Sequence, residues 1–104
     1  MMKDKAVFYN TQREHFELLN QYVPVVARVH GGNHPEFHEV RKLFGLIAEK
    51  AKTAGVAGPE LEQEFAQLRA VSGHYTVPDD VCESYEAVYK ALVQLDEAFQ
   101  SLRK

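Results

Sequence analysis

Residues 25–47 read VVARVHGGNHPEFHEVRKLFGLI, and this stretch decides the fold. An apolar pattern with helical spacing ends just before Gly31 and Gly32, and a second such pattern begins a few residues later. Glycine ends helices because it tolerates the left-handed backbone conformation, and Asn33 with Glu36 has the spacing of a helix N-terminal cap. Because the connection is short, the stretch predicts a hairpin of two antiparallel helices.

Working outward from the hairpin, the apolar spacing predicts four helices. The first spans about residues 8–29 and continues through Pro24, because the pattern resumes in phase after the proline. The second spans about residues 35–53, the third runs from Pro59 to Ser72, and the fourth begins at Pro78.

Each of the four helices has a predicted buried stripe. The stripe of the first helix consists of Thr11, His15, Leu18, Tyr22, Val25 and Val29, with Phe16, Leu19 and Val26 beside it. The stripe of the second helix consists of Phe37, Val40, Phe44, Ile47 and Ala51, widened by Leu43, and that of the third consists of Leu61, Phe65, Leu68 and Val71. The stripe of the fourth helix, the most regular in the chain, consists of Val81, Tyr85, Val88, Leu92, Leu95, Phe99 and Leu102.

The fold class follows from these helices and from the lack of any competing strand pattern. We predict an all-α, antiparallel up-down four-helix bundle with a short third helix, forming a single domain over residues 1–104. At 1.5 Å per residue the third and fourth helices would be about 21 Å and 37 Å long. The end of the fourth helix, with Leu95, Phe99 and Leu102, should then be thinly covered, and we predict a homodimer through it.

Composition excludes several kinds of partner. Twelve Lys and Arg against fifteen Asp and Glu give a net charge of -3, with the signs interspersed, which argues against nucleic acid and acidic membranes. No segment resembles a signal peptide or approaches the ~20 apolar residues of a membrane span.

The single cysteine, Cys82, agrees with a reducing compartment, so we predict a cytoplasmic location. We expect its thiol to be buried and inert, because Asp79, Asp80 and Glu83 oppose the helix dipole.

Two separated stretches carry a resemblance to a known family. Residues 26–44, VARVHGGNHPEFHEVRKLF, and 68–97, LRAVSGHYTVPDDVCESYEAVYKALVQLDE, resemble the hemerythrin-like domain of the di-iron iron-sulfur cluster repair proteins. Two parts of these stretches are distinctive. One is the turn with Val-His-Gly at 29–31 and His-Pro-Glu at 34–36, and the other is the Thr-x-Pro-x-x-x-Cys pattern of residues 76–82 at the start of the last helix. The resemblance implies a bundle that holds two irons at one end, with histidine and glutamate ligands.

The positions to which the resemblance assigns iron ligands carry other residues here. They are Tyr9, Ala54, Gly58 and Leu102, and the region around Ala54 lacks the family's His-x-x-x-Glu motif. Tyr9 alone among them has a side chain that could ligate a metal. The resemblance thus implies the fold and argues against the family's cofactor, and we predict that no cofactor is bound.

Four histidines offer an alternative metal site. His34 and His38 are spaced i, i+4, His30 lies across the turn from them, and His15 lies on the predicted stripe of the first helix. The favoured interpretation is that His30, His34 and His38 are solvated or capping residues and that His15 is a satisfied core histidine. The alternative is a site that binds iron or another metal and is rebuilt from these four side chains or completed across a dimer.

Two functions are open on the sequence alone. The chain has no nucleophile, base and orienting residue in a recognisable set and no phosphate-binding glycine motif, which argues against an enzyme with catalytic residues. The first function is a non-enzymatic, metal-free binding or assembly module related to iron-sulfur cluster repair, with a protein partner or a second copy as its target. The alternative is a metal-binding protein of the nitrosative or oxidative stress response.

Overall fold

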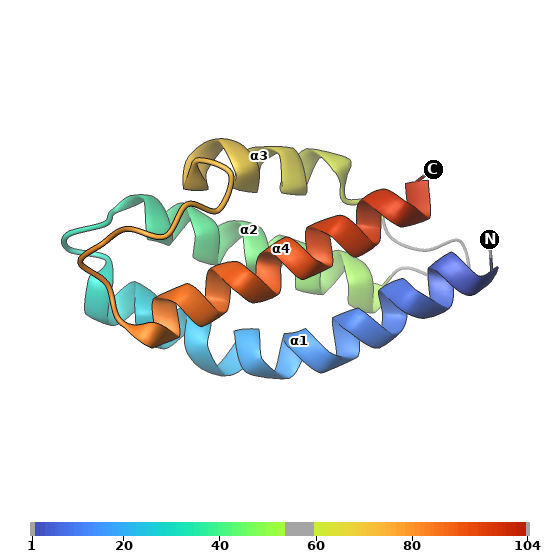
Figure 1. The fold of residues 1–104 in the computed structure, drawn as a ribbon, viewed down its shortest axis with the longest axis horizontal. Helices are drawn as coiled ribbons and strands as arrows, with labels where there is room; N and C mark the ends of the chain where they lie inside the picture. Colours follow the sequence, from blue (N-terminus) through green and yellow to red (C-terminus); the bar gives the residue numbers. More distant parts are fainter. Residues whose placement is uncertain (1, 54–59, 104) are drawn as a thin grey trace.

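The computed structural model describes the backbone of residues 2–53 and 60–103 and the side chains of residues 13–52 and 60–101. These residues form four helices and no strand: α1 (Met2–His30), α2 (Glu36–Thr53), α3 (Glu62–Ser72) and α4 (Glu83–Arg103). Successive helices run in opposite directions, and the molecule measures 41 × 22 × 20 Å (Figure 1). The predicted all-α four-helix bundle is confirmed, and α3 is the shortest of these helices.

The helix order places two connections at one end of the bundle. α1 packs against α2 and α4, and α2 packs against α3. The α1–α2 turn and the α3–α4 connection lie together at one end, whereas the start of α1 and the end of α4 lie at the other (Figure 1). The last residues of α1 therefore lie beside the first residues of α4. In the described part of the chain, no helix has the length and hydropathy of a membrane span.

Aromatic rings fill much of the core. The Phe37 ring centroid lies 4.9 Å from that of Tyr85 and 6.2 Å from that of Tyr89, and the rings of Phe65 and Phe99 are 5.4 Å apart. Most of the stripe residues predicted for α2, α3 and α4 are buried, namely Phe37, Val40, Phe44, Ile47, Leu61, Phe65, Leu68, Tyr85, Val88, Leu92, Leu95 and Phe99. Helical spacing alone was enough to predict which faces of these three helices form the core.

The stripe predicted for α1 is wrong by about one residue. Val25 is 38% exposed and Val29 is 62% exposed. Adjacent apolar residues, as at positions 18–19 and 25–26, let two stripes offset by one residue satisfy the same spacing, and packing against α4 selects between them. The buried residues of α1 are Leu19, Val23, Val26 and Ala27.

The expectation that the end of α4 is thinly covered is also wrong. Leu95 and Phe99 are 1% and 0% exposed within a single chain. α1 begins at Met2, earlier than the predicted Phe8, so its first turns run beside the last turns of α4 (Figure 1). The Phe65 ring covers Phe99 from α3. The side chain of Leu102 lies outside the described residues.

Helix α4 begins five residues later than predicted, at Glu83 instead of Pro78. The backbone N–H groups of Tyr85 and Glu86 both donate to the carbonyl of Cys82, at 3.1 and 3.3 Å, so Cys82 immediately precedes the first turn. Asp79 and Asp80 consequently belong to the α3–α4 connection and not to the helix.

The hairpin glycines do not have the predicted left-handed conformation. Among the described glycines, positive φ occurs at Gly73, where it is 61°. The backbone N–H of Gly73 donates to the Arg69 carbonyl, and α3 ends at this residue as predicted. Gly31 is required for a different reason, because a Cβ atom there would overlap the imidazole ring of His38 and the carbonyl oxygen of Ala27. Close packing, and not backbone conformation, explains glycine at that position.

Candidate functional site

A thiol and an imidazole meet where α1 ends and α4 begins. The Nε2 atom of His30, the last residue of α1, lies 3.2 Å from the Sγ atom of Cys82. Cys82 is exposed, so the prediction of a buried thiol is wrong. That prediction placed Cys82 inside the fourth helix, whereas the helix begins one residue after it.

The surroundings of Cys82 favour its thiolate form. The hydrogen bond with His30 has the largest effect, and the backbone N–H groups of Tyr85 and Ser84 act in the same direction against a smaller effect of burial. Together they lower the pKa of Cys82 from 9.0 to about 7. The Cys82 thiol therefore loses its proton more readily than an ordinary cysteine thiol does.

His34 joins the start of α2 to the α3–α4 connection. Its Nε2 atom lies 2.9 Å from Oδ1 of Asp80, and its Nδ1 atom lies 3.2 Å from Oε2 of Glu36. Desolvation opposes the charged imidazole, but the hydrogen bonds and charges of Asp80 and Glu36 outweigh it and raise the pKa of His34. His34 therefore bridges two acidic side chains, and protonation of its imidazole strengthens the bridge.

The two histidines, His30 and His34, both lie beside the buried ring of Tyr85. The ring centroids of His30 and His34 lie 5.7 and 5.8 Å from that of Tyr85, each in an edge-on arrangement. Burial raises the pKa of Tyr85, so its hydroxyl stays neutral, and it lies 3.2 Å from the hydroxyl of Tyr89. We name the set His30, His34, Asp80 and Cys82 the hairpin-end cluster.

The other two candidate histidines have different neighbours. His38 is exposed, and its ring lies against Gly31. His15 is half-buried, and its Nε2 atom lies 2.6 Å from the side-chain oxygen of Gln94 on α4. His15 is therefore satisfied by a side chain, as predicted, but it lies beside the core stripe instead of on it.

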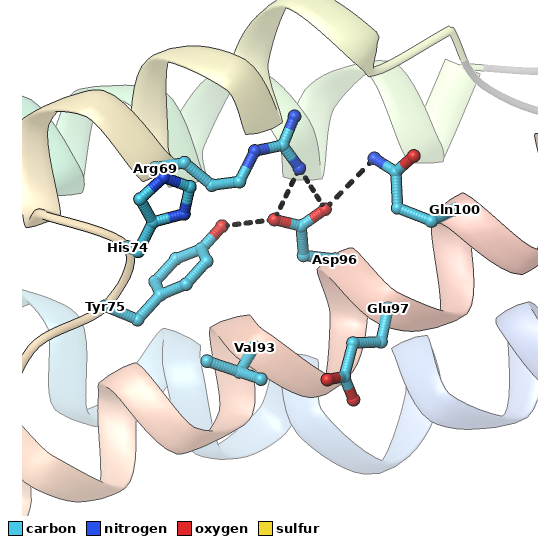
Figure 2. Close-up of a pocket in the computed structure, with 7 residues that line it drawn as sticks. All are labelled: Arg69, His74, Tyr75, Val93, Asp96, Glu97 and Gln100. Carbon is cyan, nitrogen blue, oxygen red and sulfur yellow. Dashed lines mark hydrogen bonds and ion pairs between the residues drawn. The ribbon is translucent and has the colours of Figure 1, made fainter.

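A second polar cluster, which the sequence did not reveal, joins α3 to α4. Figure 2 shows the carboxylate of Asp96 pointing toward Arg69, Tyr75 and Gln100. The Nη1 atom of Arg69 donates to both oxygens of Asp96 at 2.7 and 2.9 Å, the Tyr75 hydroxyl donates at 2.8 Å, and Nε2 of Gln100 donates at 3.3 Å. Burial and the neighbouring Asp96 raise the pKa of Tyr75, so its hydroxyl remains a donor. No sequence motif links these residues, because Arg69 and Asp96 are 27 positions apart.

The turn after α3 positions this cluster. His74 and Tyr75 both have positive φ, at 57° and 63°, which is unfavourable for residues with a Cβ atom. Ser72 stabilises the turn, because its hydroxyl accepts a bond from the backbone N–H of Tyr75 at 2.8 Å. The turn directs the Tyr75 hydroxyl to Asp96 and leaves an open pocket of about 260 Å³ lined by Arg69, His74, Tyr75, Val93, Asp96, Glu97 and Gln100.

The described residues do not fit a di-iron centre. Within residues 13–52 and 60–101, no three His, Cys, Asp or Glu side chains are grouped so that they could hold a metal ion. Glu64 is buried and its Oε1 atom has no hydrogen-bond partner, but its Oε2 atom lies 2.6 Å from the ammonium of Lys50. That ammonium already balances the charge that a metal would balance.

The positions that the resemblance assigns to iron ligands are not covered by this structure. Ala54 and Gly58 lie outside the described residues, and so do the side chains of Tyr9 and Leu102. For these four positions, only the amino-acid sequence gives information on metal binding.

Fold and site together define an all-α four-helix bundle with a thiol–imidazole contact at one end. Compared with curated proteins, the chain is 24% identical over 120 residues to the iron-sulfur cluster repair protein ScdA of Staphylococcus haemolyticus (strain JCSC1435). The match covers 86% of this chain and 54% of the relative, so the chain spans about half the relative's length. No family model and no solved structure matches the chain. Distant homology thus relates the chain to iron-sulfur cluster repair proteins, as its sequence suggested.

Proposed function

We propose that the chain is a metal-free hemerythrin-like bundle that acts as a non-enzymatic binding or assembly module in cytoplasmic iron-sulfur cluster repair. One observation carries the proposal: the chain is related to a repair protein, yet Ala54, Gly58 and Leu102 stand where the resemblance expects iron ligands. Alanine, glycine and leucine side chains have no atom that can bind iron. The bundle then supplies a shape and a surface instead of a redox centre.

The packing of the described residues supports a metal-free interior. A di-iron bundle site needs several carboxylates and imidazoles that project inward from facing helices. Here the inward-facing side chains of α3 and α4 include the rings of Phe65 and Phe99, which touch each other. The two buried acids in the described part of the chain, Glu64 and Asp96, each pair with a basic residue of a neighbouring helix. Such paired acids act as structural links between helices.

A binding module needs an accessible surface for its partner. Val25 and Val29 are exposed and lie one turn apart on α1, so they form a small apolar strip. We include homodimer formation in the proposal and assign it to this strip, because the end of α4 that the sequence suggested is covered within one chain. Apolar side chains on a helix face are what a second helix packs against most readily.

The alternative function requires a metal site that is built from the four histidines or completed across a dimer. Both ring nitrogens of His34 contact carboxylates, and His15 contacts Gln94. The His38 ring packs against Gly31. These contacts favour the metal-free module over the stress-response metal protein.

Two binding measurements test the proposal. Melting temperature is first measured with and without added iron(II) and zinc, since a ligand that binds the folded state raises it. We expect no metal-dependent rise, and a rise that is lost in the His34→Ala, His38→Ala variant would support the alternative function. Binding of the metal-free chain to a purified full-length iron-sulfur cluster repair protein is then measured by analytical ultracentrifugation. We expect a complex, and failure to form either this complex or a homodimer would contradict a binding role.

A further inference from the structure

The contact between His30 and Cys82 has the geometry of a nucleophile held by a base. An imidazole within hydrogen-bond reach of a thiol can take the thiol proton and leave a thiolate beside an imidazolium. The 3.2 Å separation of Nε2 and Sγ meets this condition. The two residues come from different helix ends, and backbone hydrogen bonds fix both ends, so the fold brings the two side chains together.

The first turn of α4 also favours the thiolate form of Cys82. The backbone N–H groups of Tyr85 and Ser84 lower the pKa of Cys82. The N–H groups of a first helical turn lack partners within the helix, and they form the positive end of the helix dipole. The helix start and the imidazole therefore both favour the anionic form of the sulfur.

Two carboxylates at this end of the bundle contact His34 and not Cys82. They are Asp80 in the connection and Glu36 on α2, and both raise the pKa of the His34 imidazole. Tyr85 on α4 remains neutral because burial raises its pKa. His30 is thus the titratable side chain with the largest effect on the Cys82 thiolate, and the carboxylates of Asp80 and Glu36 are held elsewhere.

We propose that Cys82 and His30 form a reactive thiol–imidazole pair in which His30 takes the thiol proton during attack, and that Cys82 is a modification site for low-molecular-weight disulfides. The thiolate attacks one sulfur of the small disulfide, so a bond forms between Cys82 Sγ and that sulfur while the original sulfur–sulfur bond breaks. The departing thiolate takes the proton from the His30 imidazolium. Cys82 is oxidised to a mixed disulfide, and half of the small disulfide is released as a reduced thiol.

The position of Cys82 determines what the modification changes. Cys82 is the only cysteine of the sequence, so the mixed disulfide cannot be exchanged for a bond within the chain and is removed by a thiol from another molecule. The added group replaces the contact between His30 and Cys82 at the junction of α1 and α4. Modification therefore alters the exposed end of the bundle next to the hairpin.

Reaction rates with glutathione disulfide and with iodoacetamide test the proposal. For wild type the rate of alkylation should rise with pH through a midpoint of about 7, the pKa of Cys82. A thiol of pKa 7 has about 50-fold more thiolate at pH 7 than one of pKa 9, but its thiolate is about 8-fold less nucleophilic, which leaves an advantage of about sixfold. The His30→Gln variant should accordingly react several-fold more slowly than wild type at pH 7. At pH 9.5 the order should reverse, because both thiols are then ionised and the more basic one attacks faster.

Matched variants separate the effect of His30 from a general effect of losing a histidine. His15→Gln removes a histidine that contacts Gln94, far along α1 from Cys82, and should leave the rate unchanged. Cys82→Ser should form no adduct by mass spectrometry. A wild-type midpoint near 9.0, or equal rates for wild type and His30→Gln at pH 7, would overturn the proposal. If His30→Gln does not show the helical circular dichroism of the wild type, the wild-type pH profile decides alone.

Discussion

Arg69 on α3 and Asp96 on α4 are joined by two hydrogen bonds from one guanidinium nitrogen to both carboxylate oxygens, at 2.7 and 2.9 Å. The pair therefore links the short helix α3 to α4. Tyr75 donates to the same carboxylate, so the α3–α4 connection is tied to the pair (Figure 2). Removal of this carboxylate would leave the donors of Arg69, Tyr75 and Gln100 without their shared acceptor.

We expect Asp96→Ala to lower the free energy of unfolding by about 3 kcal/mol, because it leaves a partly buried guanidinium and a tyrosine hydroxyl without their acceptor. Urea denaturation measures this. The matched control is Glu97→Ala on the exposed side of the same helix, which should change stability by less than about 0.5 kcal/mol. Equal effects of the two substitutions would show that the Asp96 cluster does not stabilise the fold.

Two glycines should respond in opposite directions to alanine. Gly73 has positive φ, so Gly73→Ala should cost about 1 kcal/mol in unfolding free energy. Gly45 lies inside α2, and a Cβ atom added there would meet no atom within 4 Å, so Gly45→Ala should stabilise the protein by about 0.5–1 kcal/mol. Thermal and urea unfolding of both variants measure the difference, and a stabilising Gly73→Ala would contradict the observed turn.

The His34 bridge predicts a pH-dependent contribution to stability. The pKa of His34 is raised above the value of 6.5 expected in the unfolded chain, because the effects of Asp80 and Glu36 outweigh desolvation. The folded state therefore binds the proton more tightly, so the stabilisation is fully present below pH 6.5 and is lost as the pH rises through the raised pKa. The difference in unfolding free energy between wild type and His34→Gln should be larger at about pH 6 than at about pH 9.

An NMR titration of the His34 imidazole gives the same information directly. Its midpoint should lie above 6.5, and Asp80→Asn should move it down, because that substitution removes one of the two negative charges. A midpoint at or below 6.5 in wild type would contradict the bridge.

The homodimer should depend on the exposed strip of α1. Light scattering at high micromolar concentration should give the mass of two chains for wild type and the mass of one chain for Val25→Lys, Val29→Lys, because the added charges would have to be desolvated in the interface. Leu46→Lys, at an exposed position of α2, is the control and should remain dimeric. A monomeric wild type would end the proposal of self-association.

Helical spacing predicted the fold and the buried faces of α2, α3 and α4, where most of the predicted stripe residues are buried. The same spacing failed for α1, where adjacent apolar residues allowed two phases. The start of α4 was misplaced because Pro78 and two aspartates are typical of a first turn, whereas the carbonyl of Cys82 accepts the first helical bonds.

The candidate site was only partly predictable. His30 and His34 were singled out from the sequence, but Cys82 was expected to be buried, and its contact with His30 spans 52 positions. A contact of that range depends on which helix ends meet, which local patterns do not specify. The Asp96 cluster was missed for the same reason, since Arg69 and Asp96 look like ordinary surface charges in the sequence.

We propose above all that this relative of an iron-sulfur cluster repair protein holds no iron. The iron content of the full chain, produced in iron-supplied cells, purified without oxygen and analysed by mass spectrometry of the metal, tests this proposal directly. We predict far less than one iron per chain. About two irons per chain, the complement of a di-iron bundle site, would contradict the metal-free bundle.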